Sequence, residues 1–184
     1  MTTVGQRLIT AEEFMKMPDP PDGSQQELIR GMIITMPPPI GGHGVCCMKV
    51  GFTVYSFVSA NKLGHVTSND AGFISERDPD TVRGPDVAYW SSERVKEVPE
   101  GYFEVPPDLA VEVVSPNDTH LRVQEKVRHY LTHGVHMVWV VDPELRIVTV
   151  YRSKELARTL EETDTLSGED VLPGFSCRVA DLFP

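Results

Sequence analysis

Apolar residues recur along this chain with two different spacings, which predict a mixture of strands and helices. Residues 135–141 (VHMVWVV) form a continuous apolar run, which is typical of a strand buried on both faces. Residues 146–151 (RIVTVY) alternate between apolar and polar types, as expected for a strand with one buried face. By the same patterns we expect strands at 64–76, 86–90 and 108–114, and an edge strand at 157–163.

Two long segments have helical character. Residues 44–60 follow a glycine-rich loop and are apolar around much of their circumference. A second helix is expected to begin at the N-cap candidates 117–119 and to end at Gly134, because its apolar residues recur at helical spacing. Thr10 and Glu13 have the spacing of a capping box, which predicts a short helix near the N-terminus.

Glycine and proline clusters separate these elements. Residues 26–36 predict a hairpin with its turn near Arg30 and Gly31, and residues 78–85 predict a turn. Strands followed by a long helix and more strands indicate an α/β (α+β) fold, in which helices flank a mixed central sheet. A length of 184 residues suits one domain, so we expect residues 1–184 to form a single unit.

Composition narrows the class of protein. Hydrophobic residues make up 40% of the chain and charged residues 24%, which is typical of globular proteins. We expect no membrane span and a cytoplasmic protein, because the chain has neither a long apolar stretch nor a secretory signal pattern. Three cysteines without ligand spacing argue against a disulfide framework or a zinc ribbon. The net charge of −10 argues against a broad DNA-coating surface, although a local metal centre can still hold a phosphate.

Acidic residues occur where the predicted strands would bring them together. Asp86 begins one strand, Glu112 lies inside the apolar run 111–114, and Glu27 lies in the predicted hairpin. A carboxylate inside a buried strand is costly unless a partner or a metal neutralises it. Mg²⁺ and Mn²⁺ prefer oxygen ligands, usually one or two carboxylates with water and substrate phosphate. Lys126, on the helix that follows Glu112, is placed to orient a water and to stabilise developing negative charge.

Short motifs spread over nearly the whole chain have a characteristic order and spacing. They are LITAEEF (8–14), ELIRG (27–31), VRGPDV (82–87), DLAVEVVSP (108–116), EK (125–126), GV (134–135), VWVVDP (138–143) and VLPGF (171–175). In this order they resemble the Uma2 family of endonucleases, which belongs to the PD-(D/E)XK nuclease superfamily. The resemblance implies a restriction-endonuclease-like fold and metal-dependent hydrolysis of phosphodiester bonds in DNA.

The superfamily motif is an aspartate followed by Glu-X-Lys on the next strand. Asp86 matches the first acid and Glu112 the second, whereas Val114 stands where the lysine is usual. Lys126 matches a lysine that has moved to the following helix. Glu27 matches an additional acid that such nucleases often carry near the N-terminus.

The resemblance also implies a set of roles. Asp86, Glu112 and the backbone carbonyl of Val113 would bind Mg²⁺ or Mn²⁺, Lys126 would position the attacking water, and Glu27 would be an accessory acid or second-metal ligand. DNA is the expected partner, and a homodimer is expected because a duplex has two strands to cut. The rival hypothesis is a nuclease-fold protein that no longer cuts and acts as a binding or regulatory module.

Each candidate also has an ordinary structural interpretation. Asp86 could cap the start of a strand, Glu27 could be a hairpin charge, and Lys126 could be an exposed helix lysine. Glu112 could form a structural ion pair with a neighbouring arginine or lysine.

Histidines offer a second kind of ligand. His43 could contact a phosphate or help the metal site, but a polar residue at a helix entry is the simpler interpretation. His129 and His133 have the i, i+4 spacing of zinc ligands. They lack a Glu-x-x-His motif, so we interpret them as surface or helix-end residues.

Overall fold

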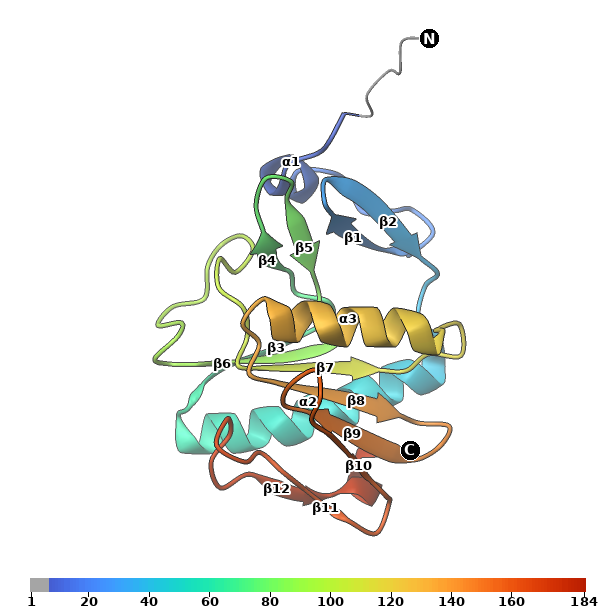
Figure 1. Ribbon diagram of the computed structural model, residues 1–184, viewed down its shortest axis with the longest axis vertical. Coiled ribbons are helices and arrows are strands. Elements are labelled where there is room, and N and C mark those ends of the chain that lie inside the picture. The colour runs from blue at the N-terminus through green and yellow to red at the C-terminus, as the bar shows by residue number, and fades with distance from the viewer. Residues whose placement is uncertain (1–6) are drawn as a thin grey trace.

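Figure 1 shows the computed structural model, which describes residues 7–184. The largest sheet has six strands in the order β10-β9-β8-β7-β6-β3. Its strands are β3 (Gly64–Ser68), β6 (Val87–Ser91), β7 (Leu109–Val113), β8 (Met137–Asp142), β9 (Ile147–Tyr151) and β10 (Ala157–Leu160). β7 and β8 pair in parallel while the other neighbours are antiparallel, so the sheet is mixed.

Two helices cover opposite faces of this sheet (Figure 1). They are α2 (Gly41–Asn61) and α3 (His120–Thr132). Val54 of α2 belongs to the same core as Val111, whereas Val127 of α3 belongs to the same core as Ala110. Successive residues of a strand face opposite sides, so β7 needs apolar residues at adjacent positions, which explains its continuous apolar pattern.

A four-stranded sheet lies at the end of the molecule nearer the N-terminus (Figure 1). Its order is β2 (Met32–Met36), β1 (Gln25–Ile29), β5 (Thr81–Arg83) and β4 (Phe73–Glu76). The hairpin β1–β2 turns at Arg30 and Gly31, which both have positive φ, and this confirms the predicted turn. The predicted capping box of Thr10 and Glu13 is present at α1 (Ala11–Met15), which packs beside this sheet.

The C-terminal segment completes the core on the α2 side. It contains the two-stranded sheet of β11 (Thr165–Ser167) and β12 (Ser176–Arg178), followed by the 3₁₀ helix η1 (Val179–Leu182). Leu166 and Leu182 are buried against residues of α2 and of the large sheet. No helix within residues 7–184 is long and apolar enough to cross a bilayer.

The predicted mixed sheet with flanking helices is confirmed, but three local predictions need correction. The segment 64–76 is two strands rather than one, because Asn69 and Asp70 adopt left-handed φ angles of 60° and 56° and turn the chain. Residues 81–83 were expected within a turn, yet they form β5, which pairs with both β1 and β4. α2 begins at Gly41, so the glycine-rich segment forms the first helical turn instead of a loop.

Candidate metal centre

Asp86 and Glu112 lie opposite each other on neighbouring segments of the large sheet. β6 pairs antiparallel with β7 and brings Val87 beside Val111, so the residue before Val87 is level with Glu112. The backbone N–H of Val113 donates to Asp86 Oδ2 over 2.6 Å. This bond joins the first predicted acid to the strand that carries the second.

Glu112 is buried, with 7% of its surface exposed, and both of its carboxylate oxygens are occupied by donors from α3. Lys126 Nζ donates to Oε2 over 2.8 Å, and the Tyr130 hydroxyl donates to Oε1 over 2.6 Å. Burial raises the pKa of Glu112 to about 7, an effect that Lys126 opposes. Burial lowers the pKa of Lys126, but the carboxylates of Glu112 and Glu27 outweigh it, so the pKa of Lys126 is raised and the ammonium is retained.

Glu27 lies on β1 and brings a further carboxylate to this group. It is 4% exposed, and its Oε2 accepts a 2.6 Å hydrogen bond from Arg83. Its Oε1 is buried and makes no hydrogen bond, while Lys126 Nζ lies 3.8 Å away. A buried carboxylate oxygen without a donor is costly, so this atom has ligand capacity to spare.

Asp70 is a fourth acid near the centre, and the sequence interpretation did not include it. It lies in the turn between β3 and β4, where the side-chain amide of Gln25 donates to its carboxylate. Burial raises the pKa of Asp70 to about 7, and the charges of Asp86 and Glu27 act in the same direction. The Asn69-Asp70 pair was a recognisable turn signal, because both types tolerate left-handed φ angles.

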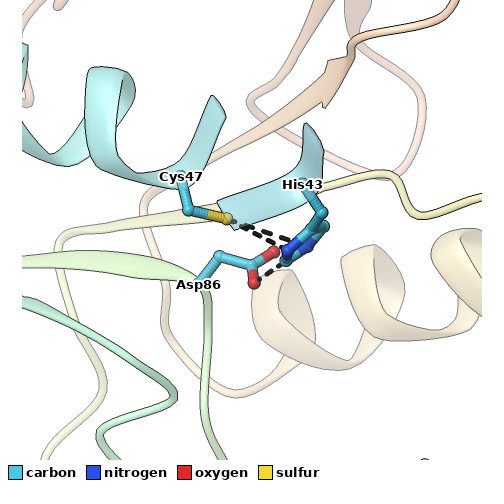
Figure 2. A group of neighbouring side chains, drawn as sticks. All are labelled: His43, Cys47 and Asp86. Carbon is cyan, nitrogen blue, oxygen red and sulfur yellow. Dashed lines mark hydrogen bonds and ion pairs between the residues drawn. The ribbon is translucent and has the colours of Figure 1, made fainter. Parts of the chain in front are cut away.

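His43 and Cys47 meet Asp86 from the other side of the large sheet (Figure 2). They are one turn apart on α2, and Cys47 Sγ lies 3.4 Å from His43 Nδ1. His43 Nε2 lies 3.3 Å from Asp86 Oδ1, and this contact raises the pKa of His43 despite burial. Burial raises the pKa of Cys47 well above its ordinary value, so the thiol stays neutral. His43 lies in the first turn of α2, as the helix-entry interpretation has it, and its ring also contacts a predicted site residue.

The carboxylates line three cavities. A cavity of about 510 Å³ is lined by Asp70, Asp86 and His43, together with residues of α2 and β3. A second cavity of about 280 Å³ is lined by Glu27, Glu112 and residues of α3 and β2. The side chain of Asp86 is turned to α2 and that of Glu112 to α3, so these two acids line different cavities. Glu27 and Asp70 together line the third cavity, of about 500 Å³.

Groups of three ligand side chains within 4.8 Å of one another occur twice in residues 7–184. They are His43, Cys47 and Asp86, and Glu76, His129 and His133. The three predicted acids, Glu27, Asp86 and Glu112, do not form such a group.

Glu27, Glu112 and Lys126 all have close charged partners in the structure. The side chain of Lys126 is 21% exposed and bound to Glu112, so it is not a plain surface lysine. Glu27 is buried and paired with Arg83, so it is not a simple hairpin charge. Glu112 does form an ion pair, with Lys126 as the partner.

Comparison with known proteins places these residues in a family. The model of the Uma2 family, described as "Putative restriction endonuclease", matches residues 11–180. The chain belongs to the Uma2 family. A crystal structure described as a putative nuclease belonging to DUF820, from Anabaena variabilis, is similar with a TM-score of 0.78 and 25% sequence identity. The match covers 95% of this chain and 97% of that one. No curated protein matches the chain.

The family and the fold support a nuclease-like function, and the donor set is consistent with a metal centre. Four carboxylates lie close enough to affect the pKa of their neighbours, namely Glu27, Asp70, Asp86 and Glu112. Oxygen donors of this kind suit a hard divalent cation, whose charge would offset their mutual repulsion. Oε1 of Glu27 is buried and accepts no hydrogen bond, and this is the clearest sign that these residues fit a cation.

Proposed function

We propose that this Uma2 protein is a metal-dependent, endonuclease-like phosphodiesterase that hydrolyses DNA. The observation that supports this most is that Lys126 of α3 binds Glu112 of β7, while Asp86 accepts a hydrogen bond from the next residue of the same strand, in a chain whose family is described as a putative restriction endonuclease. In this proposal Asp86, Glu112 and the Val113 carbonyl hold Mg²⁺ or Mn²⁺. When bound, such an ion would polarise a phosphate oxygen and lower the pKa of a water.

The side chains of the chain itself have defined tasks in this proposal. Lys126 offers an ammonium that positions the attacking water and stabilises negative charge developing on the phosphate. Tyr130 fixes the orientation of the Glu112 carboxylate through its short hydrogen bond. Arg83 does the same for Glu27, which serves as an accessory acid or as a ligand for a second ion.

DNA is the proposed substrate, and the cytoplasm is the proposed location. The net charge of −10 favours local contacts at the centre over extensive binding of the DNA backbone. We further propose a homodimer, because cutting both strands of a duplex calls for two centres. Sedimentation of the purified chain with and without a DNA duplex tests this, and a monomer under both conditions would contradict it.

The test of the proposed function is cleavage of a supercoiled plasmid with Mg²⁺ or Mn²⁺. We expect nicked and linear products that disappear with a chelator, and a loss of at least about 100-fold in rate for Asp86→Asn and for Glu112→Gln. Glu97→Gln is the matched control, because Glu97 is exposed and lies outside the centre. If Asp86→Asn cleaved the plasmid at the same rate as the parent, the activity would come from a contaminant or from another site.

The rival function predicts a different pattern. A nuclease-fold module that no longer cuts would bind DNA or another partner without cleaving single-stranded or double-stranded substrates with either ion. Divalent-metal stabilisation separates the two cases, since a working centre raises the melting temperature with Mn²⁺ and Asp86→Asn removes the rise. Absence of both cleavage and metal stabilisation favours the rival.

A further inference from the structure

A second group of metal-ligand side chains lies at the C-terminal end of α3. Glu76 ends β4, His129 lies in the last turn of α3, and His133 is the C-cap that follows this helix. One ligand atom from each of the three side chains lies within 4.8 Å of the other two. Both histidines lie at the end of α3, as the sequence indicated, with His129 in the last turn and His133 as the C-cap, and they face a carboxylate from another element.

Helical spacing and strand placement together create the group. Residues four apart lie on one face of a helix, and the two imidazole rings stack with centroids 4.1 Å apart. The third side chain, Glu76, comes from strand β4 and not from the helix. A Glu-x-x-His motif does not include this carboxylate, because Glu76 is distant in sequence from both histidines.

Neighbouring groups orient each possible ligand. His133 Nδ1 lies 2.7 Å from the backbone oxygen of His129, which directs Nε2 to Glu76 Oε1 over 3.0 Å. The hydroxyl of Thr81 donates to the other carboxylate oxygen of Glu76 over 2.9 Å. His129 Nε2 lies 2.7 Å from the Ser75 hydroxyl. Outer contacts of this kind fix the tautomer and ring orientation of metal-binding histidines.

Charge and access also suit a cation. The side chains of Glu76 and His133 are 32% and 22% exposed, so an ion can reach them. Burial lowers the pKa of His129 to about 4, and its neutral ring keeps a lone pair at neutral pH. Arg83 also lowers that pKa, but its charge is balanced by the ion pair with Glu27.

We propose that Glu76, His129 and His133 form a second metal site, which binds a divalent transition ion of the zinc class. Two imidazoles and one carboxylate are a ligand set that zinc takes with a water in the fourth position, and imidazole favours zinc over magnesium. The ion would take the place of the direct contact between His133 Nε2 and Glu76 Oε1. It ties β4 of the small sheet to α3, the helix that also carries Lys126 and Tyr130.

The test uses the full chain, stripped with a chelator and titrated with Zn²⁺ by calorimetry without DNA. All samples carry Cys47→Ser, so that the cluster of His43, Cys47 and Asp86 offers no thiol. We expect one strong site in this parent, and an affinity lower by at least about 100-fold in Glu76→Gln and His133→Ala, since changing a residue that only orients a ligand already costs about 10–100-fold. His120→Ala is the control, because His120 is exposed on the same helix.

Two results would overturn the proposal. One is parent-like Zn²⁺ affinity in Glu76→Gln, a substitution that keeps the shape of the side chain. The other is an equal loss of affinity in His120→Ala, which would indicate binding to exposed histidines. Melting temperature supplies a second readout: Zn²⁺ should raise it in the parent and not in Glu76→Gln. Neither readout depends on cleavage, so a failure of the nuclease proposal leaves this test intact.

Discussion

Lys126 Nζ lies 2.8 Å from Glu112 Oε2, although the two residues come from a helix and a strand. Val114 occupies the sequence position at which the superfamily motif has its lysine. The ammonium group therefore reaches Glu112 from α3, the helix that packs on one face of the sheet, and not from β7 itself. Because the pair is largely buried, it is a structural contact as well as a proposed part of the catalytic centre.

Lys126→Met should destabilise the protein, because it leaves a buried carboxylate without its cation. Breaking one partner of a buried ion pair costs about 3–5 kcal/mol, and the partial exposure of Lys126 favours the lower end. Urea unfolding measures the change in the free energy of unfolding. The double variant Glu112→Gln, Lys126→Met should lose less than Lys126→Met alone. Lys154→Met is the control, since Lys154 is exposed, and a loss of the same size there would refute the explanation.

Tyr130→Phe should cost about 1–3 kcal/mol in the free energy of unfolding, because Glu112 Oε1 loses its donor while the ring stays in the core. In the proposed centre the same change lets the carboxylate rotate, so the affinity for Mn²⁺ should also fall. Denaturation and calorimetry measure the two effects. Tyr55→Phe on the exposed face of α2 should change neither quantity. Unaltered stability of Tyr130→Phe would mean that the hydrogen bond contributes nothing net.

The sequence was sufficient to predict the strand that carries Glu112 and the helix that carries Lys126. A carboxylate within the apolar run of β7 pointed to Glu112, and the motif around Asp86 pointed to its neighbour on the adjacent strand. The helix after β7 placed Lys126 within reach because its N-cap, Thr119, and its apolar face were both recognisable. These signals are local, so a single sequence contains them.

The contacts that the sequence did not predict all depend on chain reversal or long-range packing. Asp70 reaches the centre only because residues 69–70 turn the chain, and the pattern around them resembled one long strand. Tyr130 has the helical spacing of a core residue, and nothing local shows that its hydroxyl meets Glu112. Glu76 approaches the two helix histidines through the small sheet, whose strand β5 was interpreted as a turn.

Gly84 precedes Asp86 by two residues and lies against the backbone of Asp70, so Gly84→Ala should disturb the candidate metal centre. A Cβ at this position would lie 2.3 Å from the backbone oxygen of Asp70, so the turn of Asp70 must shift. We expect a cost of about 1–3 kcal/mol, typical of overpacking, together with weaker Mn²⁺ binding. Gly41→Ala is the matched control, because a Cβ there meets nothing within 4 Å. If both variants were as stable as the parent, the close approach of Gly84 to Asp70 would have no energetic consequence.

The buried thiols should make the protein less stable in alkali. Burial raises the pKa of Cys46 and of Cys177 from 9.0 to about 11, so both thiols stay protonated in the folded chain at a pH where the unfolded chain loses their protons. The unfolded state then binds fewer protons, and the stability that is present below pH 9 falls as the pH rises toward about 11. Urea unfolding at about pH 7.5, below that window, and at about pH 10, within it, should show the decrease.

Replacing the thiols separates this effect from the titration of other groups. Cys46→Ala with Cys177→Ala should show a smaller fall in stability between the same two pH values, because neither remaining methyl group ionises. The native chain should also react with a thiol reagent much more slowly than the urea-unfolded chain, since the thiolate is the reactive form and Cys46 has no exposed surface. An equal pH dependence in the double variant and the parent would assign the alkaline loss to Cys47, whose pKa burial also raises, or to tyrosines or lysines.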